Sequence, residues 1–418
     1  MEPSFGTDDL RVYERFSKLF TKKLHLGDGG DGIVHAYEHK SSKALVAVKT
    51  PLPYSSEHEA LKASKRLEAE IANLAIVRQH EHIAGMLAWS YIPVGPAIFL
   101  PFCELGDLNQ YVLNWKFEQG KQGKVIKRIS EVTIWKCLHD MALALDYLHN
   151  KHEDYGYTHN DIKPDNILVD LPSGWKLEDG IPDEPVFKLT DFARMTRYNP
   201  SERAQPTQFC GTPEYAPPFS ERGGLRPSAD IWALGGTLQT LALGVYPIQS
   251  REAFSAGRHE EKQNAPLLVD EGAWKKSHWR HLIPPTFRPL SATQEELRDN
   301  FDVHESIVIN EFYPNRPWEH KPYSRRLDGW YEWMFEVDEK KRITARMLVG
   351  YCVPRIARMI RVTREKEKAE ECFERAKALR EVVERKQQGK VVADEGMVFG
   401  VVNVPRDEGK DYHAIEAE

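Results

Sequence analysis

The spacing of hydrophobic residues changes near residue 103. Upstream, the pattern predicts strands around 32–38, around 44–49 and twice within 86–102, and a helix over 57–79. Downstream the spacing is mostly helical, and it predicts a strongly periodic helix over 130–150. A chain of 418 residues is long enough for two lobes that each bury a core. The pattern predicts a bilobal α+β fold with a strand-rich N-terminal lobe and a mainly helical C-terminal lobe.

Three further segments flank or interrupt these lobes. Residues 8–20 have helical spacing and indicate a leading helix packed on the first lobe, so 1–21 is interpreted as an N-terminal helical extension. Residues 250–325 are too aromatic for a linker and are expected to pack on the second lobe. A C-terminal tail, 355–418, begins as a charged helical extension and is expected to be flexible from 389. The helix carries an apolar stripe that packs on its own domain or docks on a partner: Ala369, Cys372, Phe373, Ala376, Leu379 and Val383.

Composition narrows the class of protein. The hydrophobic share of 41% and the charged share of 29% are those of a globular protein. A net charge of −6 gives no general attraction to nucleic acid or to anionic lipid, and no apolar run approaches the length of a membrane span. Five scattered cysteines suggest neither a disulfide framework nor a zinc site. We expect no nucleic-acid partner, no membrane, and a cytoplasmic or nuclear location.

The richest motif is His-Asn-Asp-Ile-Lys-Pro-Asp-Asn at 159–166, followed by an apolar run that predicts a supporting strand. It places Asp161, Lys163 and Asn166 on one short loop, and Asp191 follows a second strand-like run. Phosphoryl transfer needs such a set: a carboxylate that accepts the hydroxyl proton, a cation that neutralises the moving group, and oxygens that hold a metal.

A glycine-rich turn, with Gly27, Gly29 and Gly32, lies between two strand-like runs. Glycines allow the backbone to approach a phosphate closely, although the acidic Asp28 and Asp31 must then point outward. Lys49 follows on an apolar run, where an ammonium needs a charge partner.

The partner of Lys49 is expected on the next helix. Glu70 is the better candidate because Leu74, one turn later, shares its face. Glu68 is the rival, and it lies on a different face from Leu74 and Val77.

Taken in order, these motifs resemble the eukaryotic protein kinases, over residues 22–354. The matching segments are 27–34, 46–49, Glu70, 159–166, 191–193, 211–218, 230–235 and 338–342. The resemblance implies a kinase N-lobe at 22–103 and a C-lobe at 104–354, with the 250–325 segment as an insertion. Thr212, with Lys163 two residues after Asp161, is similar to the serine/threonine branch. The implied activity is transfer of the γ-phosphoryl group of ATP to Ser and Thr hydroxyls of a protein substrate.

The resemblance also implies a role for each matching residue. Asp161 would be the base, Lys163 would stabilise the transferred group, and Thr212 would contact both. Asn166 and Asp191 would bind Mg²⁺. The nucleotide-binding set would comprise the glycine-rich loop (Gly27, Gly29, Gly32), Lys49 with Glu70, the adenine contacts Val34, Ala47 and Leu168, the hinge residues Pro101 and Cys103, and Asp107 at the ribose. Cys103 is also a candidate for electrophilic inhibitors.

One departure from the family pattern concerns regulation. Asn160 stands where many regulated kinases have an arginine that binds a phosphate on the activation segment, and the usual phosphosite falls at Gln208, with Thr207 one place off. We therefore expect activity that is independent of activation-segment phosphorylation.

Two other departures affect single contacts. Ala193 replaces a glycine and is less free to adopt positive φ. Pro218-Phe219 replaces a Pro-Glu pair, so Arg342 needs another partner, for which Glu214 and Glu221 are the candidates.

Two other classes of function stay open. A small-molecule kinase of the aminoglycoside or choline type has a similar loop but lacks the equivalents of Lys163 and of segment 211–215. A pseudokinase that serves as a scaffold would need a hidden defect, for which Ala193 and the acidic glycine-rich loop are the candidates. Either the 250–325 segment or the C-terminal helix is a possible docking site for a partner.

Overall fold

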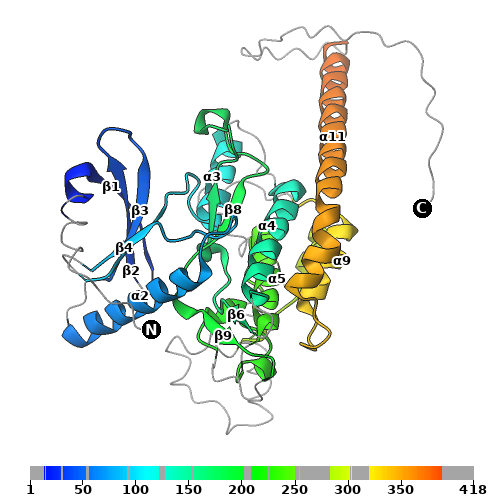
Figure 1. The fold of residues 1–418 in the computed structure, drawn as a ribbon. Helices are drawn as coiled ribbons and strands as arrows, with labels where there is room; N and C mark the ends of the chain where they lie inside the picture. Colours follow the sequence, from blue (N-terminus) through cyan, green and yellow to red (C-terminus); the bar gives the residue numbers. More distant parts are fainter. Residues whose placement is uncertain are drawn as a thin grey trace. The chain divides into compact units, whose positions relative to one another are not determined.

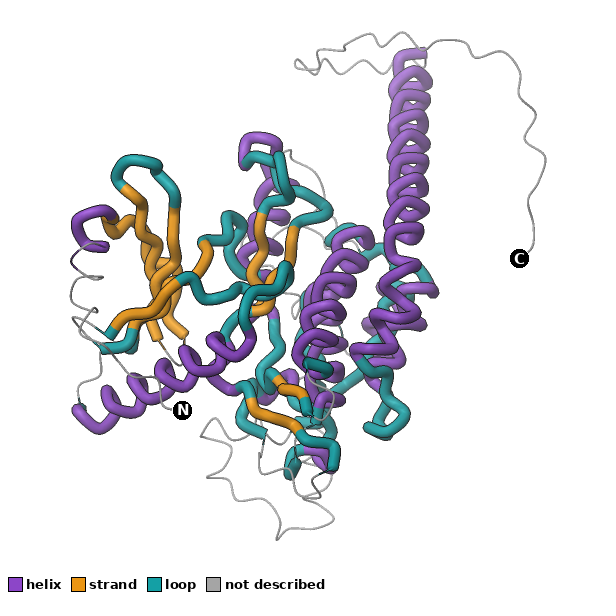
Figure 2. The backbone as a smooth tube through the Cα atoms, viewed as in Figure 1, coloured by secondary structure: helices purple, strands orange, loops and turns teal. Residues whose placement is uncertain are grey.

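The computed structural model describes most of the chain in two compact units, Met1–Arg364 and Glu365–Glu418. The described residues are 14, 16–29, 32–52, 56–91, 95–121, 128–151, 155–201, 209–224, 226–249, 254, 283–301, 303 and 320–387. Strands gather in the N-terminal part of the first unit and helices in the rest of it (Figures 1 and 2). The predicted bilobal α+β architecture is confirmed.

The N-terminal lobe is built on an antiparallel sheet with strand order β1-β2-β3-β5-β4. Its strands are β1 (Phe20–Gly29), β2 (Gly32–His39), β3 (Leu45–Thr50), β4 (Ala88–Ser90) and β5 (Ala97–Pro101). Each strand predicted within 32–38, 44–49 and 86–102 is therefore present.

The leading helix packs on this sheet, as expected. Of the predicted range 8–20, residues 14 and 16–19 are described as helical, and Phe20 already begins β1. The ring of Phe16 lies against those of Phe20, Tyr37 and Phe99 at 4.5–5.2 Å between centroids. Phe20 also packs against buried residues of β3 and β5.

Helix α2 (Glu57–Val77) fills the predicted helical segment and connects the two lobes. Ser56 caps its start by accepting a hydrogen bond from the Glu59 N–H at 3.3 Å. Its buried face carries Leu67, Glu70, Ile71, Leu74 and Val77. This face places one carboxylate, that of Glu70, among apolar side chains.

The C-terminal lobe is mainly helical and surrounds two long buried helices, α4 (Glu131–His149) and α5 (Pro227–Leu243). Ser130 caps α4 through the Val132 N–H at 3.2 Å. The other helical elements are α3 (Leu108–Lys121), η1 (Pro164–Asn166), η2 (Leu177–Asp179), η3 (Phe192–Arg194), η4 (Pro213–Tyr215), η5 (Phe219–Glu221), α8 (Gln294–Phe301), α9 (Arg325–Glu332), η7 (Trp333–Phe335), α10 (Ala345–Met347), η8 (Leu348–Cys352) and α11 (Val353–Gln387).

Two short antiparallel strand pairs support the loops between these helices. The hairpin of β7 (Ile167–Asp170) and β8 (Val186–Leu189) follows the 159–166 loop, and β6 (Gly156–Thr158) pairs with β9 (Thr196–Tyr198). The loop is therefore held between β6 and β7.

The described part of the 250–325 segment packs on the C-terminal lobe, as predicted. The Phe287 ring stacks on Tyr331 at 5.2 Å between centroids. The Arg288 guanidinium is buried and donates to the carbonyls of Tyr246, Ile248 and Phe301. Residues 250–253, 255–282 and 304–319, with Trp274 and Trp279, lie outside the described residues.

The C-terminal helix extends the chain as expected, and α11 ends at Gln387. Residues 388–418, for which flexibility is predicted, lie outside the described part of the chain. Among the described helices, none combines the length and the apolar character that spanning a membrane requires.

Candidate active site

The nucleotide side of the site is organised around the ammonium of Lys49. Its Nζ lies 2.7 Å from Glu70 Oε2 and 3.1 Å from Asp191 Oδ1. Burial alone would lower the pKa of Lys49, but the charges of Glu70 and Asp191 raise it above its ordinary value. Burial alone would raise the pKa of Asp191, but the charge of Lys49 and its hydrogen bond outweigh burial, so the pKa lies below its ordinary value. The three groups form a largely buried, charged network that joins β3, α2 and the start of η3.

The predicted pairing of Lys49 with Glu70 is confirmed. Glu70 is 1% exposed and lies on the buried face of α2. Its rival Glu68 accepts a hydrogen bond from Tyr91 instead. Burial, and then this hydrogen bond, raise the pKa of the Tyr91 phenol to about 12.

The catalytic-loop carboxylate, Asp161, is buried and held from several sides. Its Oδ1 accepts hydrogen bonds from the Thr212 N–H at 2.9 Å and from Thr212 Oγ1 at 2.8 Å. Its Oδ2 accepts one from Asn166 Nδ2 at 3.2 Å, and Lys163 Nζ lies 3.7 Å away. The predicted contact of Thr212 with Asp161 is thus present, and Lys163 reaches the same carboxylate.

The 159–166 loop is anchored by Asp230 of α5, a residue for which no role was predicted from the sequence. Its carboxylate accepts the backbone N–H groups of His159 and Asn160, both at 2.8 Å, and lies 2.9 Å from His149 Nε2. Burial alone would raise the pKa of Asp230, but the bond from His149 and the charges of His149 and His159 lower it. Asp230 was included in the matching segment 230–235, but no role was assigned to it there.

The two residues assigned to a metal have suitable chemistry. Asn166 Nδ2 also donates to the Asp161 carbonyl at 2.7 Å, which leaves the amide oxygen as its ligand atom. Asp191 is the carboxylate beside Lys49, and it has a left-handed backbone with φ of 63°. Amide and carboxylate oxygens are the ligands that Mg²⁺ prefers, so the donor set fits this ion.

The glycine-rich turn joins β1 and β2, where Gly29 pairs with Gly32 across the hairpin. A Cβ on Gly32 would lie 2.5 Å from the Thr50 carbonyl oxygen, so this glycine is required by the neighbouring strand β3. Gly27 and Gly29 have room around them, which agrees with an open loop. Asp28 is exposed and lies 3.5 Å from His25, so it points outward as expected. Asp31 lies outside the described residues.

The adenine and hinge candidates lie around the sheet and the β7 hairpin. Ala47, on β3, pairs with Leu100, while Val34 pairs with Lys49 and packs on the core. Pro101 ends β5, and Leu168, on β7, forms a bridge with Asp107.

One of these candidates, Cys103, differs from the expectation, and another, Asp107, has an additional role. The Cys103 thiol is buried, and burial raises its pKa to about 12, so it is a poor target for electrophiles. The prediction that inhibitors reach it is wrong, because the residue is only 6% exposed. Asp107 Oδ1 accepts the Gln110 N–H at 2.8 Å and so caps α3, a role that coexists with the predicted contact to ribose.

Asn160 replaces the family arginine with neutral contacts to the activation segment. It is buried with φ of 67°, a conformation that asparagine tolerates better than most residues. Its Nδ2 donates to the Arg194 carbonyl and to Thr196 Oγ1, both at 2.9 Å. These bonds join the catalytic loop, 159–166, to the residues that follow Asp191, where the activation segment begins. Thr207 and Gln208 lie outside the described residues.

The structure also accommodates the two other departures from the family pattern. Arg342 forms a bidentate pair with Glu221, at 2.5 and 2.8 Å, which selects one of the two predicted candidates. Ala193 lies within η3 and is not among the described residues with positive φ, so alanine fits there without strain. Asn73 of α2 holds η3 by donating to the Phe192 carbonyl at 2.7 Å.

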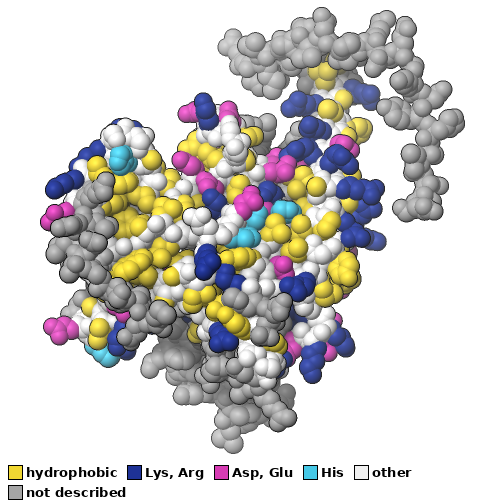
Figure 3. Space-filling view, in the orientation of Figure 1, with side chains coloured by type: hydrophobic (Ala, Val, Ile, Leu, Met, Phe, Trp, Pro, Cys, Tyr) yellow, Lys and Arg dark blue, Asp and Glu magenta, His cyan; other side chains and the backbone are white. Residues whose placement is uncertain are grey.

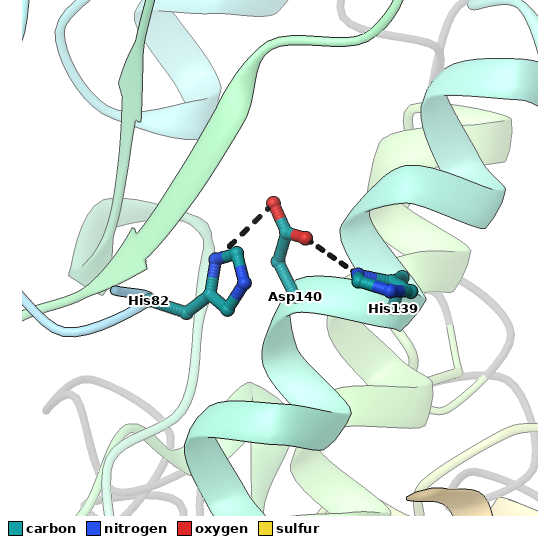
Figure 4. A group of neighbouring side chains, drawn as sticks. All are labelled: His82, His139 and Asp140. Carbon is teal, nitrogen blue, oxygen red and sulfur yellow. Dashed lines mark hydrogen bonds and ion pairs between the residues drawn. The ribbon is translucent and has the colours of Figure 1, made fainter. Parts of the chain in front are cut away.

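A cluster outside this site resembles a metal centre in its residue types: His82, His139 and Asp140 (Figure 4). However, Lys136 Nζ lies 2.6 Å from both oxygens of the fully buried Asp140 carboxylate, and the Phe187 N–H donates to Oδ2 at 3.0 Å. A metal ion would have to displace the ammonium. We interpret the cluster as an ion-pair hub that ties α4 to β8.

Comparison with known proteins identifies the class. Residues 20–351 match the protein kinase domain. The chain belongs to the protein kinase family, as its motifs predicted.

Named relatives are serine/threonine kinases and Aurora kinases. The serine/threonine-protein kinase ATG1 of Debaryomyces hansenii is 24% identical over 309 residues, which cover 69% of this chain and 34% of that protein. An Aurora kinase of Schizosaccharomyces pombe is 31% identical over 232 residues, 55% of this chain and 56% of that protein. The human serine/threonine-protein kinase ULK1 is 28% identical over 308 residues, 73% of this chain and 26% of that protein. The chain spans 34% of the length of the first of these relatives, and their names describe those longer proteins.

Proposed function

We propose that this chain is an ATP-dependent serine/threonine protein kinase. The observation that carries the proposal is the combined geometry of two networks, Lys49 with Glu70 and Asp191, and Asp161 with Thr212. The first network is the family's arrangement for holding nucleotide phosphates, and the second orients a base. The family match and the serine/threonine kinases among the relatives support the same activity.

In this proposal each group has one task. Asp161 Oδ2 accepts the proton of the acceptor hydroxyl, because Oδ1 is already bonded twice to Thr212. Lys163, on the same loop, stabilises the transferred phosphoryl group, and Lys49 holds the α- and β-phosphates. Asn166 and Asp191 would hold Mg²⁺, which neutralises phosphate charge when bound.

We also infer that activity does not require a phosphate on the activation segment. A phosphate normally secures this segment by pairing with the arginine before the catalytic aspartate. Here Asn160 reaches the segment directly, through Arg194 and Thr196, without any charge. The connection is therefore built into the fold rather than added by modification.

Two alternatives are less well supported. A small-molecule kinase would lack Lys163 and Thr212, whereas both contact Asp161 here. A pseudokinase needs a broken network, and the described site has its lysine pair and its base in place.

A labelled-ATP assay with a generic protein substrate tests the proposal. The wild-type protein should transfer phosphate, and Asp161→Asn, which keeps the shape of the side chain, should lose activity by about two to four orders of magnitude. Equal incorporation by both proteins would defeat the catalytic assignment.

Partners and location are proposed more broadly. A protein substrate follows from the proposed activity, and we place the location in the cytoplasm or nucleus from composition. In the second unit, Phe373, Leu379 and Val383 are exposed on α11, which supports this helix as a partner site. Figure 3 shows acidic and basic side chains on one face of the molecule, with basic ones gathered along its right-hand edge. The proposal of a protein partner rather than nucleic acid therefore rests on the net charge of −6.

A further inference from the structure

One cation beside the catalytic base has no role in the proposed reaction. The Nε of Arg194 lies 3.6 Å from Asp161 Oδ2, the oxygen that is available to an acceptor hydroxyl. Lys163 approaches the same oxygen at 3.7 Å. An incoming hydroxyl must therefore reach Oδ2 beside a guanidinium as well as an ammonium.

The backbone of Arg194 is fixed, while its side chain is partly free. Asn160 Nδ2 donates to the Arg194 carbonyl at 2.9 Å, and Asn73 Nδ2 donates to the Phe192 carbonyl at 2.7 Å. The Arg194 side chain is 33% exposed. The guanidinium can therefore turn toward a ligand without movement of the segment that carries it.

A guanidinium stays charged under all working conditions and offers donors in a planar fork that matches a carboxylate or phosphate. When an acceptor hydroxyl bonds to Oδ2, the contact between Arg194 and Asp161 weakens, and Arg194 needs another anion. The substrate residue beside the acceptor is the group that arrives at the same moment and at the same place.

We propose that Arg194 selects substrates in which an Asp, Glu or phosphorylated residue flanks the acceptor Ser or Thr. This inference rests on the proposed kinase function. Arg194 acts on the substrate, as a specificity residue, while Asp161 and Lys163 carry out the transfer.

Steady-state kinetics on two peptides test the inference. The peptides are identical except for Glu or Gln beside the acceptor. For the wild type, kcat/KM should favour the Glu peptide by about fivefold, mainly through a lower KM, because one charge-assisted pair at a partly exposed site provides that much discrimination. Arg194→Gln should bring the ratio close to one, and Arg194→Lys should restore part of it.

Arg197 provides a matched control, because its guanidinium lies over the Tyr155 ring, 4.0 Å from the centroid. Arg197→Gln should keep the wild-type ratio. The inference is overturned if Arg194→Gln keeps the preference for Glu, or if it raises or lowers kcat equally on both peptides, as removal of a plug or of a catalytic group would. A wild type that is active on both peptides without preference overturns this inference alone. A wild type that phosphorylates neither peptide overturns the kinase proposal together with it.

Discussion

Lys49 and Arg342 are both buried cations paired with a glutamate, but they belong to regions that follow the family pattern differently. The nucleotide region, with Lys49, Glu70 and Asp191, pairs as the motifs imply. In the activation-segment region, with Asn160, Arg194, Glu221 and Arg342, the family's partners are replaced and the connections are kept by other residues. The difference indicates that phosphoryl transfer requires particular residues in the nucleotide region. In the activation-segment region, different residues can form the bonds that hold the segment in place.

The largest expected effect is on stability, at the rebuilt ion pair. Arg342→Met leaves the Glu221 carboxylate buried without its bidentate partner, and should lower the free energy of unfolding by about 3–5 kcal/mol. Denaturant unfolding measures it. The double variant with Glu221→Gln should lose less than the sum of the single variants; simple additivity would show that the two residues are not coupled.

Next comes the nucleotide region. Lys49→Met should lower kcat by about a hundred- to a thousand-fold, because one positioned charge at the phosphates is lost. Lys49→Arg is the matched control, and should recover little because its planar fork does not replace a compact ammonium. Near wild-type turnover in Lys49→Met would show that the Lys49 network is structural only.

The two regions also differ in how far sequence could predict them. The strands β2 to β5 and the helices α2 and α4 followed from periodicity, which depends on local spacing. The pair of Lys49 with Glu70 followed from motif order and from the helical spacing that puts Glu70 and Leu74 on one face. The anchor Asp230, the Asn73 bond and the position of Arg194 depend on residues that the fold brings together from distant segments. Periodicity shows that a residue is buried but not what it meets. Cys103 lies beyond the end of β5, where no regular spacing indicates burial, so its burial was missed.

A smaller effect should arise where the activation segment meets the catalytic loop. A Cβ on Gly211 would lie 2.3 Å from the Asn160 carbonyl oxygen, so Gly211→Ala should destabilise the protein by about 1–3 kcal/mol through overpacking. Gly223→Ala is the control, since nothing lies within 4 Å of a Cβ there. Thermal unfolding of both variants measures it, and equal melting temperatures would refute the close contact.

The smallest effect separates the two properties of Asn160. Asn160→Gly keeps the positive φ and removes the hydrogen bonds, and should cost about 1 kcal/mol. Asn160→Ala should cost about 1 kcal/mol more, because alanine is strained in the left-handed region. Both should also slow phosphate transfer. Unfolding curves and transfer rates are measured on the same samples. Full activity in both variants would rule out Asn160 as the connection to the activation segment.

The most direct test of the central claim is the turnover of phosphate-free protein. The protein is treated with phosphatase, mass spectrometry verifies that no phosphate remains, and the initial rate is compared with that of the untreated sample and of Thr207→Ala. If Asn160 holds the segment, all three rates should agree within about twofold, because no phosphate contributes to the connection. Loss of nearly all activity in the treated protein or in Thr207→Ala would contradict the account.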